Sequence, residues 1–139
     1  MDKDLKEKMF KAAVEAKKNA YVPYSKFPLG AAVLTEDGSI YSGANIENAS
    51  YSLTNCAERS AIFNAVSQGE RKIEALLIVS STEDPVTPCG ACRQVIEEFA
   101  DGEIDVIMMT EDGKELSMTS TELLPGAFSE SSMEKNNEL

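Results

Sequence analysis

The sequence of 139 residues contains no histidine and no tryptophan, and only three cysteines. Without an imidazole, no mechanism with a histidine base or ligand is available, which excludes the Ser-His-Asp and Cys-His classes of hydrolase. An odd number of cysteines is a poor basis for a disulfide framework. In a reducing compartment, three cysteines are better explained as free thiols or metal ligands.

Long apolar runs and an excess of positive charge are also missing. No stretch approaches the roughly 18 to 20 apolar residues that span a bilayer, and residues 1–18 lack the apolar core of a signal peptide. We therefore expect a cytoplasmic protein with no membrane partner. Its 13 basic and 24 acidic residues give a formal net charge of −11, which repels phosphate polymers and disfavours a nucleic-acid partner.

The pattern of apolar residues predicts helices that alternate with short strands. We expect helices at 5–20, 57–68 and 90–100, and strands at 29–35, 39–44, 75–80, 104–109 and 114–118. Asp-Gly pairs at 37–38 and 112–113 are hairpin turn signals, Gly69 suits a helix C-terminus, and Thr121 is a candidate cap for a short helix. The order predicts one α/β domain with helices on a mixed sheet, followed by a polar, flexible tail at 129–139.

Cys89 and Cys92 form a Cys-x-x-Cys motif at the start of a predicted helix. Alone, this motif fits a thioredoxin-like redox pair or half of a structural zinc site as well as a catalytic metal site. Cys56 precedes the previous predicted helix in the same way, 33 residues before Cys89. If the two helices pack side by side on one face of the sheet, their N-termini bring three sulfurs together. The N–H groups and the macrodipole of each helix stabilise thiolates there.

Three cysteines without a histidine favour a metal site with one open position. Structural zinc sites close with four protein ligands, whereas catalytic sites keep a position for water. Glu58, on the same helical turn as Cys56, points past the metal and can take a proton from that water. A carboxylate as fourth ligand and a solvated Glu58 are the alternatives. Arg59 and Arg93 each follow a motif residue and can hydrogen-bond to the sulfurs, unless they are surface charges.

Cys56-Ala57-Glu58, followed by Pro88-Cys89-Gly90-Ala91-Cys92, resembles the motif of the zinc-dependent cytidine deaminase family. Cysteine replaces the histidine of the related signature, a variant that is similar to the small, homotetrameric, all-cysteine members. The resemblance covers nearly the whole chain, including segments 21–27, 45–51 and 123–128. It implies a three-layer-like α-β-α cytidine deaminase fold with a mixed five-stranded sheet.

The resemblance also implies roles for single residues in a catalytic domain over 1–128. One zinc ion per chain is bound by Cys56, Cys89 and Cys92, with Arg59 and Arg93 beside the sulfurs. Phe27 stacks on the pyrimidine and the ribose hydroxyls bind Asn45 and Glu47, so that the nucleoside contacts are Phe27, Asn45, Ile46, Glu47 and Ala57. A neighbouring subunit of the homotetramer closes the pocket with Ala49, Tyr51 and Phe128. For the two phenylalanines the alternative is core packing, and for residues 45–48 it is a polar loop.

The implied activity is hydrolytic deamination of free cytidine and deoxycytidine to uridine and deoxyuridine, with release of ammonia, in pyrimidine salvage. In that family's mechanism, zinc-bound hydroxide attacks C4 while Glu58 shuttles protons. No glycine-rich phosphate cradle is visible, which favours a nucleoside over a nucleotide. Three other functions stay open at this point: deamination of a modified or antibiotic nucleoside, a non-enzymatic binding domain stabilised by zinc, and a dithiol redox protein that uses Cys89 and Cys92 without metal.

Overall fold

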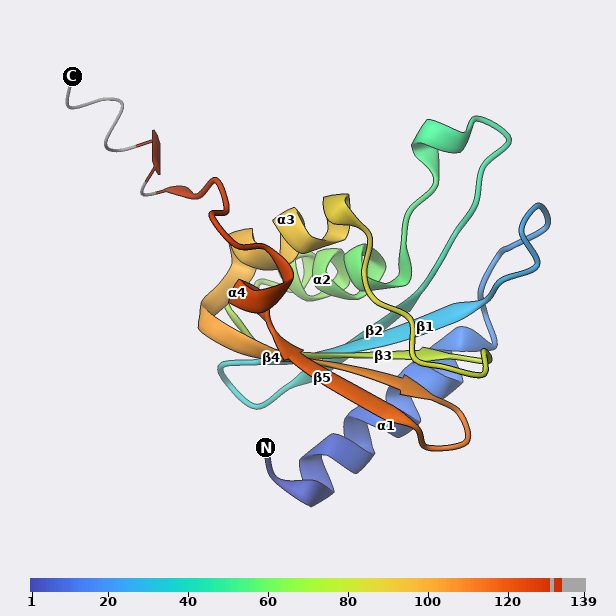
Figure 1. Cartoon of the computed structure of the whole chain (residues 1–139), viewed down its shortest axis with the longest axis horizontal. Helices are drawn as coiled ribbons and strands as arrows, with labels where there is room; N and C mark the ends of the chain where they lie inside the picture. The colour runs from blue at the N-terminus through green and yellow to red at the C-terminus, as the bar shows by residue number, and fades with distance from the viewer. Residues whose placement is uncertain (131, 134–139) are drawn as a thin grey trace.

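The computed structural model describes residues 1–130, 132 and 133, and it places one sheet between two layers of helices (Figure 1). Its helices are α1 (Lys3–Lys17), α2 (Ala57–Ser67), α3 (Gly90–Phe99), α4 (Ser120–Leu123) and the 3-10 helix η1 (Tyr51–Leu53). Its strands are β1 (Leu29–Thr35), β2 (Ile40–Ala44), β3 (Ile73–Ser80), β4 (Ala100–Thr110) and β5 (Glu115–Thr119).

The five strands form a mixed sheet in the order β2-β1-β3-β4-β5. Strands β3 and β4 are parallel, and all other neighbours are antiparallel. A parallel pair needs a crossover connection, and α3 supplies it on the face that also carries α2, while α1 covers the opposite face (Figure 1). The predicted α/β fold with α-β-α layers and a mixed five-stranded sheet is confirmed.

Strand β3 lies in the centre of the sheet and is buried on both faces. Leu76 and Ile78 belong to the apolar cluster under α2 and α3, while Leu77 and Val79 belong to the cluster under α1. Successive side chains of a strand point to opposite faces, so a strand covered by helices on both sides reads as a continuous apolar run. This explains the uninterrupted apolar sequence at 75–80.

Helix α1 ends at Lys17, earlier than the predicted end of the run at 5–20. The segment that follows pairs with the chain beyond β2. Tyr21 N–H donates to Asn45 O at 3.0 Å, and Tyr21 O accepts from Glu47 N–H at 2.8 Å. Tyr21 forms a parallel bridge in this way, and such pairing requires extended backbone. A tertiary contact therefore ends the helix, and the helical periodicity of the sequence does not reveal it.

Helix α4 is capped by Thr119, so the prediction of Thr121 as its cap is wrong. Thr119 Oγ1 accepts from the Glu122 N–H at 3.2 Å, and Glu122 Oε1 accepts from the Thr119 N–H at 2.9 Å. Such a reciprocal capping box requires a Glu or Gln three residues after the Ser or Thr. Thr119 has that spacing to Glu122, whereas Thr121 does not.

The glycine turn signals are confirmed, and one strand is longer than expected. Gly38, Gly69 and Gly113 all have positive φ angles, of 87°, 103° and 99°, a region that residues with a Cβ rarely adopt. Strand β4 begins at Ala100, which already pairs with Ile73, so it adds residues before the predicted start at 104. No helix in the part of the chain that the structure describes is long and apolar enough to cross a bilayer.

The predicted flexibility of the tail at 129–139 stays a prediction, because residues 131 and 134–139 lie outside the described residues.

The 3-10 helix η1 was not predicted from the sequence. It is a single turn without a side-chain cap hydrogen bond, and such short elements leave no periodic pattern.

Two glycines let the helices approach the sheet closely. A Cβ added at Gly30 would lie 2.0 Å from Ala13 O, and one at Gly43 would lie 2.5 Å from Ala61 N. Both neighbours are backbone atoms, which cannot rotate away. Gly30 therefore fixes the distance of α1 from β1, and Gly43 fixes the distance of α2 from β2.

Substitution of Gly30 by alanine is expected to lower the free energy of unfolding by about 3 kcal/mol, because a well-packed interface must move apart. Urea unfolding of the zinc-loaded protein measures this loss. Gly90→Ala is the matched control, since no atom lies within 4 Å of a Cβ there and alanine favours the helix that starts at this position. A similar loss in both variants would contradict the close-approach argument.

Candidate metal centre and active site

Helices α2 and α3 run side by side and begin at the same end of the molecule (Figure 1). Cys56 is the N-cap of α2, Cys89 is the N-cap of α3, and Cys92 lies in the first turn of α3. Cys89 Sγ is 3.7 Å from Cys56 Sγ and 3.3 Å from Cys92 Sγ, and all three sulfurs lie within 4.8 Å of one another. The two helix N-termini therefore bring the three cysteines together.

The three sulfurs fit a zinc ion by the chemistry of their donor set. Thiolates are preferred zinc ligands, and the sequence offers neither a fourth cysteine nor a histidine. Among the described residues, this is the one group of three or more cysteine, aspartate or glutamate side chains placed to hold a metal. Cys92 is buried, whereas Cys56 is half-buried and Cys89 is exposed, so the cluster is open on one side.

Arg59 lies beside the sulfurs, as the sequence analysis expected. Its Nη2 donates to Cys56 Sγ at 3.2 Å, which offsets negative charge on the sulfur. Hydrogen bonds from Cys92 and Arg59 lower the pKa of the Cys56 thiol to about 5 without bound metal. The hydrogen bond to Cys56 also raises the pKa of Cys92, because the shared proton stays on the Cys92 sulfur. Cys56 is thus the first of these two thiols to ionise.

Arg93 differs from its expected role as a donor to the sulfurs. Its Nε donates to Pro88 O at 2.8 Å, and its Nη1 donates to Leu123 O at 2.9 Å. The last carbonyls of a helix lack intrahelical partners, and Leu123 is the last residue of α4. Arg93 satisfies that carbonyl and also holds the peptide directly before Cys89.

Glu58 lies in the first turn of α2 and is only 3% exposed. Within the described part of the chain, its Oε1 has no hydrogen-bond partner, and burial raises the pKa of its carboxyl group. The side chain lines a cavity of about 210 Å³ together with Cys56 and Cys89. The full lining is Leu29, Asn45, Thr54, Cys56, Glu58, Ile78, Val86, Thr87 and Cys89. A buried carboxyl group with one oxygen free to accept a proton at such a place is suited to proton transfer.

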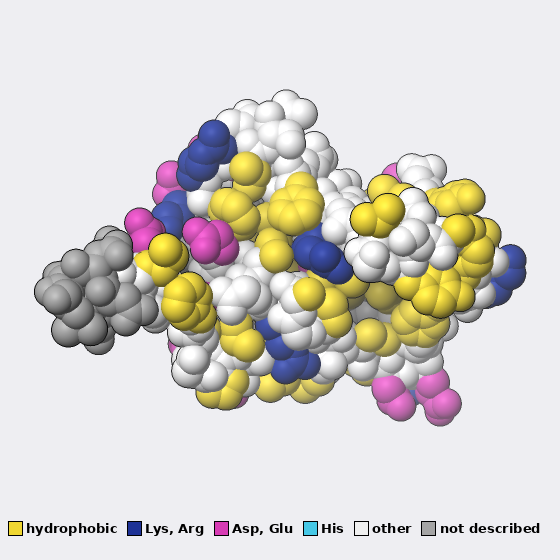
Figure 2. Space-filling model, turned by 90° about the horizontal axis from the view of Figure 1, so that it is seen from above, with side chains coloured by type: hydrophobic (Ala, Val, Ile, Leu, Met, Phe, Trp, Pro, Cys, Tyr) yellow, Lys and Arg dark blue, Asp and Glu magenta, His cyan; other side chains and the backbone are white. Residues whose placement is uncertain are grey.

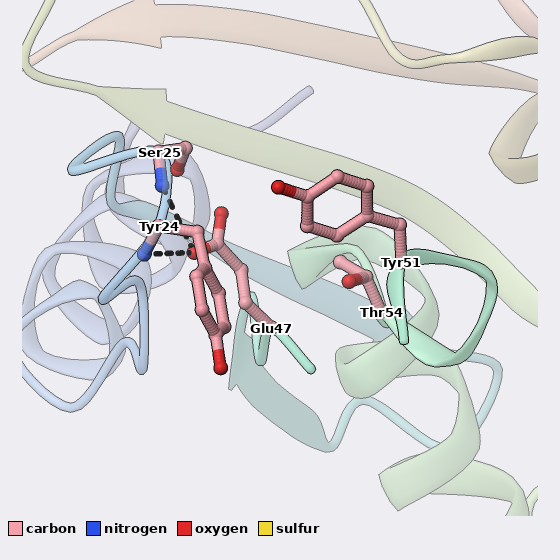
Figure 3. A pocket seen from close by; sticks show the side chains of 5 residues that line it. All are labelled: Tyr24, Ser25, Glu47, Tyr51 and Thr54. Atoms are coloured by element: carbon pink, nitrogen blue, oxygen red, sulfur yellow. Dashed lines mark hydrogen bonds between the residues drawn. The ribbon is translucent and has the colours of Figure 1, made fainter. Parts of the chain in front are cut away.

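A second cavity of about 210 Å³ is lined by Tyr24, Ser25, Glu47, Tyr51 and Thr54 (Figure 3). Thr54 also lines the first cavity, so the two cavities share a wall. Glu47 lies beside Tyr24, whose ring makes an edge-to-face contact with the ring of Tyr51 at a centroid distance of 6.2 Å. Its Oε1 accepts the N–H groups of Tyr24 and Ser25 at 3.0 and 3.1 Å. Hydrogen bonds from Ser25 lower the pKa of the Glu47 carboxyl group, so this carboxylate is an ionised acceptor.

The residues predicted for the nucleoside are divided between these cavities and their surroundings. Asn45 lines the first cavity, and its amide also bridges two backbone groups, accepting from Leu29 N–H and donating to Phe27 O, both at 2.9 Å. Glu47 and Tyr51 line the second cavity. Neither cavity is lined by Phe27, Ile46, Ala49, Ala57 or Phe128.

Several lining residues were not identified from the sequence. Thr54 follows η1, and Val86 and Thr87 belong to the connection between β3 and α3. Thr87 directly precedes the Pro-Cys pair of the motif, and this adjacency is a usable signal. Thr54 carries no such signal, because the local turn of η1 decides where it lies.

The low pKa of Cys56 predicts early alkylation of that thiol in zinc-free protein. The thiolate is the reactive form, so labelling of Cys56 by iodoacetamide should rise as the pH rises through about 5. Arg59→Met removes a hydrogen-bond donor and should move this rise toward the ordinary thiol value of about 8.5. Mass spectrometry of labelled peptides across the pH range measures both profiles.

The control for this experiment is Arg71→Met, which removes an exposed arginine that donates to the carbonyls of Val66 and Glu70. Its profile should match that of the unaltered protein. An unchanged Cys56 profile in Arg59→Met would show that the guanidinium does not stabilise the thiolate.

Comparison with known proteins gives results consistent with this geometry. A model of the cytidine and deoxycytidylate deaminase zinc-binding region matches residues 3–109. A cytidine deaminase of Sporosarcina psychrophila is 57% identical over 123 residues, which are 88% of this chain and 90% of the relative. A blasticidin-S deaminase of Bacillus cereus is 36% identical over 109 residues, which are 73% of this chain and 76% of the relative. The crystal structure of cytidine deaminase from Burkholderia pseudomallei superimposes with a TM-score of 0.85 at 42% identity, covering 92% of this chain and all of that one.

Proposed function

The chain belongs to the cytidine and deoxycytidylate deaminase family, and we propose that Glu58 is the proton shuttle of its reaction. It is a zinc-dependent hydrolase that deaminates cytidine. The proposal for Glu58 rests on its buried carboxyl group, whose Oε1 lacks a hydrogen-bond partner among the described residues. The same side chain lines a cavity together with Cys56 and Cys89.

Cys56, Cys89 and Cys92 would hold the zinc ion. When bound, zinc acts as a Lewis acid that lowers the pKa of a coordinated water molecule to about 7. Three thiolates donate much charge to a metal, and the hydrogen bond from Arg59 to Cys56 Sγ draws part of that charge away. Arg59 therefore helps to keep the site able to polarise water.

Glu58 transfers two protons in the proposed mechanism. Its carboxylate first takes a proton from the attacking water and passes it to ring N3, while the water oxygen forms a bond to C4. It then takes the second proton, from the new C4 hydroxyl, and delivers it to the amino group. The C4–N bond breaks, and uridine and ammonia leave. Because burial raises the pKa of Glu58, the carboxyl can hold each proton between transfers.

The nucleoside is proposed to occupy both cavities, with the pyrimidine beside Glu58 and the ribose toward Glu47. The shared wall at Thr54 supports this placement. Asn45 donates to the ribose hydroxyls and Glu47 accepts from them. Phe27, which lines neither cavity, is proposed to stack on the base by resemblance to the family. Ile46 and the Ala57 backbone complete the contacts. A 3′-hydroxyl is present in both sugars, so deoxycytidine is expected to react as well, in pyrimidine salvage in the cytoplasm.

A homotetramer with shared active sites is proposed from the exposed aromatic side chains. Tyr51 is 76% exposed and Phe128 is 57% exposed. On the face seen in Figure 2, hydrophobic side chains gather most densely over η1 and the neighbouring loops, and contiguous apolar surface of this kind is typical of an interface. In the proposed assembly, Ala49, Tyr51 and Phe128 of one subunit close the pocket of its neighbour.

Glu58→Ala should retain zinc and fold but lower kcat for cytidine by at least about a hundredfold, the usual contribution of general acid–base catalysis. The loss of cytidine absorbance measures turnover, and metal analysis measures zinc. Glu98→Ala, which alters an exposed glutamate of α3, should leave turnover unchanged. Unaltered turnover in Glu58→Ala would refute the shuttle and would favour a role for zinc in stability alone.

Subunit sharing predicts a mass of about four times the chain mass of 15.1 kDa in light scattering. Mixing Phe128→Ala subunits with Glu58→Ala subunits should give more activity than the sum of the two, because some sites then combine an intact Glu58 with an intact neighbouring Phe128. The matched control mixes Glu58→Ala with a chain that carries both substitutions, and it should gain no activity. A monomeric enzyme would contradict the shared sites.

A further inference from the structure

Two neighbouring side chains of α3 fasten the chain that follows α4. Arg93 Nη1 donates to Leu123 O at 2.9 Å, and Gln94 Nε2 donates to Phe128 O at 2.8 Å. Both residues directly follow Cys92 in the sequence. Helix α4 lies beside α3, and the segment after α4 continues past it (Figure 1). The two bonds therefore tie segment 123–128 to the helix that carries two of the three cysteines.

The two ends of this segment are held by different forces. Leu123 is buried in the apolar cluster under α2 and α3, so its position is fixed by packing as well as by Arg93. Phe128 is largely exposed, and packing within the chain therefore contributes little to its placement. Between them, Gly126 turns the backbone with a φ angle of 65°. The hydrogen bond from Gln94 is thus a polar contact that helps to fix the backbone at Phe128.

Arg93 connects the same segment to the metal centre. Its Nε holds Pro88 O at 2.8 Å while its Nη1 holds Leu123 O, and Pro88 directly precedes Cys89. A guanidinium group is planar and presents its N–H donors in a rigid fork. One side chain therefore sets the distance between the loop before Cys89 and the end of α4.

We propose that Arg93 and Gln94 are positioning residues that place parts of two active sites at once. Arg93 orients the loop that carries Cys89 in its own subunit, and Gln94 orients Phe128 for the pocket of the neighbouring subunit. The inference rests on the proposed function, in which Phe128 closes the neighbour's pocket. Loss of the Gln94 hydrogen bond should therefore weaken substrate binding alone. Loss of the Arg93 hydrogen bonds should weaken both substrate binding and zinc retention.

Gln94→Met removes the donor from an exposed helical position and keeps a good helix former there. It should raise KM for cytidine by about threefold to tenfold, the value of one neutral hydrogen bond. The kcat and the zinc content should not change, because among the described residues the hydrogen bond of the Gln94 side chain goes to Phe128 O and not to Glu58 or a sulfur. Gln68→Met, the same change at the C-terminal end of α2, is the matched control and should leave KM unaltered.

A double-variant comparison separates this inference from the proposed function. If Gln94 acts through Phe128, then Gln94→Met should add nothing to KM in a Phe128→Ala background. Independent, multiplying effects on KM would overturn the inference. A raised KM in Phe128→Ala together with a normal KM in Gln94→Met would also overturn the inference about Gln94. The proposal that Phe128 closes the neighbour's pocket would then still stand. A normal KM in Phe128→Ala would refute the shared pocket itself, and the inference with it.

Arg93→Lys tests the connection to the metal centre, because an ammonium group keeps the charge but loses the fork. This variant should lose zinc to a chelating dye about tenfold faster, in the range known for residues that orient metal ligands, and its KM should rise as in Gln94→Met. Zinc release is read without substrate, and thermal unfolding confirms that the variant is folded. Faster zinc loss with an unchanged KM would show that Arg93 does not link the metal centre to the neighbour's pocket. An unchanged rate of zinc loss would show the same.

Discussion

The convergence of two helix N-termini over one face of the sheet is the constraint on which the site depends. Each helix begins at a cysteine, and the sulfurs of Cys56, Cys89 and Cys92 meet within 4.8 Å. Three thiolates at this distance repel one another, so the arrangement needs compensating positive charge. The helix macrodipoles, Arg59 and a bound zinc ion supply it. Glu58 reaches the same place because it lies one residue beyond the first helical position of α2.

The topology of the sheet explains why the helices converge. Strands β3 and β4 are parallel, which requires α3 to cross back over the sheet before β4 can begin. Helix α2 reaches the same face from the β1–β2 hairpin, and Gly43 allows it to contact β2 closely. The side-by-side packing of α2 and α3 is therefore a consequence of the strand order. The apolar run of β3, buried on both faces, anchors that order.

The sequence predicted those parts of the fold and site that depend on spacing and periodicity. The Asp-Gly turns form where the local sequence places them. The three cysteines and Glu58 lie at the starts of two helices that periodicity predicts, and the structure brings the three sulfurs together because those helices pack side by side. Arg93 also follows a motif residue, as Arg59 does, yet its guanidinium binds the carbonyls of Pro88 and Leu123. That outcome depends on where α4 ends against α3. Periodicity carries no information about such a contact. It also does not predict the backbone pairing of Tyr21 with residues 45 and 47 or the position of Thr54 in both cavities.

The site also has a cost for the folded state, which links metal binding to stability. Burying the Glu58 carboxyl with Oε1 unpartnered is unfavourable, since a buried polar group without a hydrogen bond loses its hydration. Gathering three ionisable sulfurs adds to this cost. Zinc binds the assembled cluster far better than an unfolded chain, so its binding free energy contributes directly to folding. The groups that perform the reaction are thus held in place by the metal with which they act, and the fold tolerates one carboxyl oxygen without a partner among the described residues where proton transfer requires it.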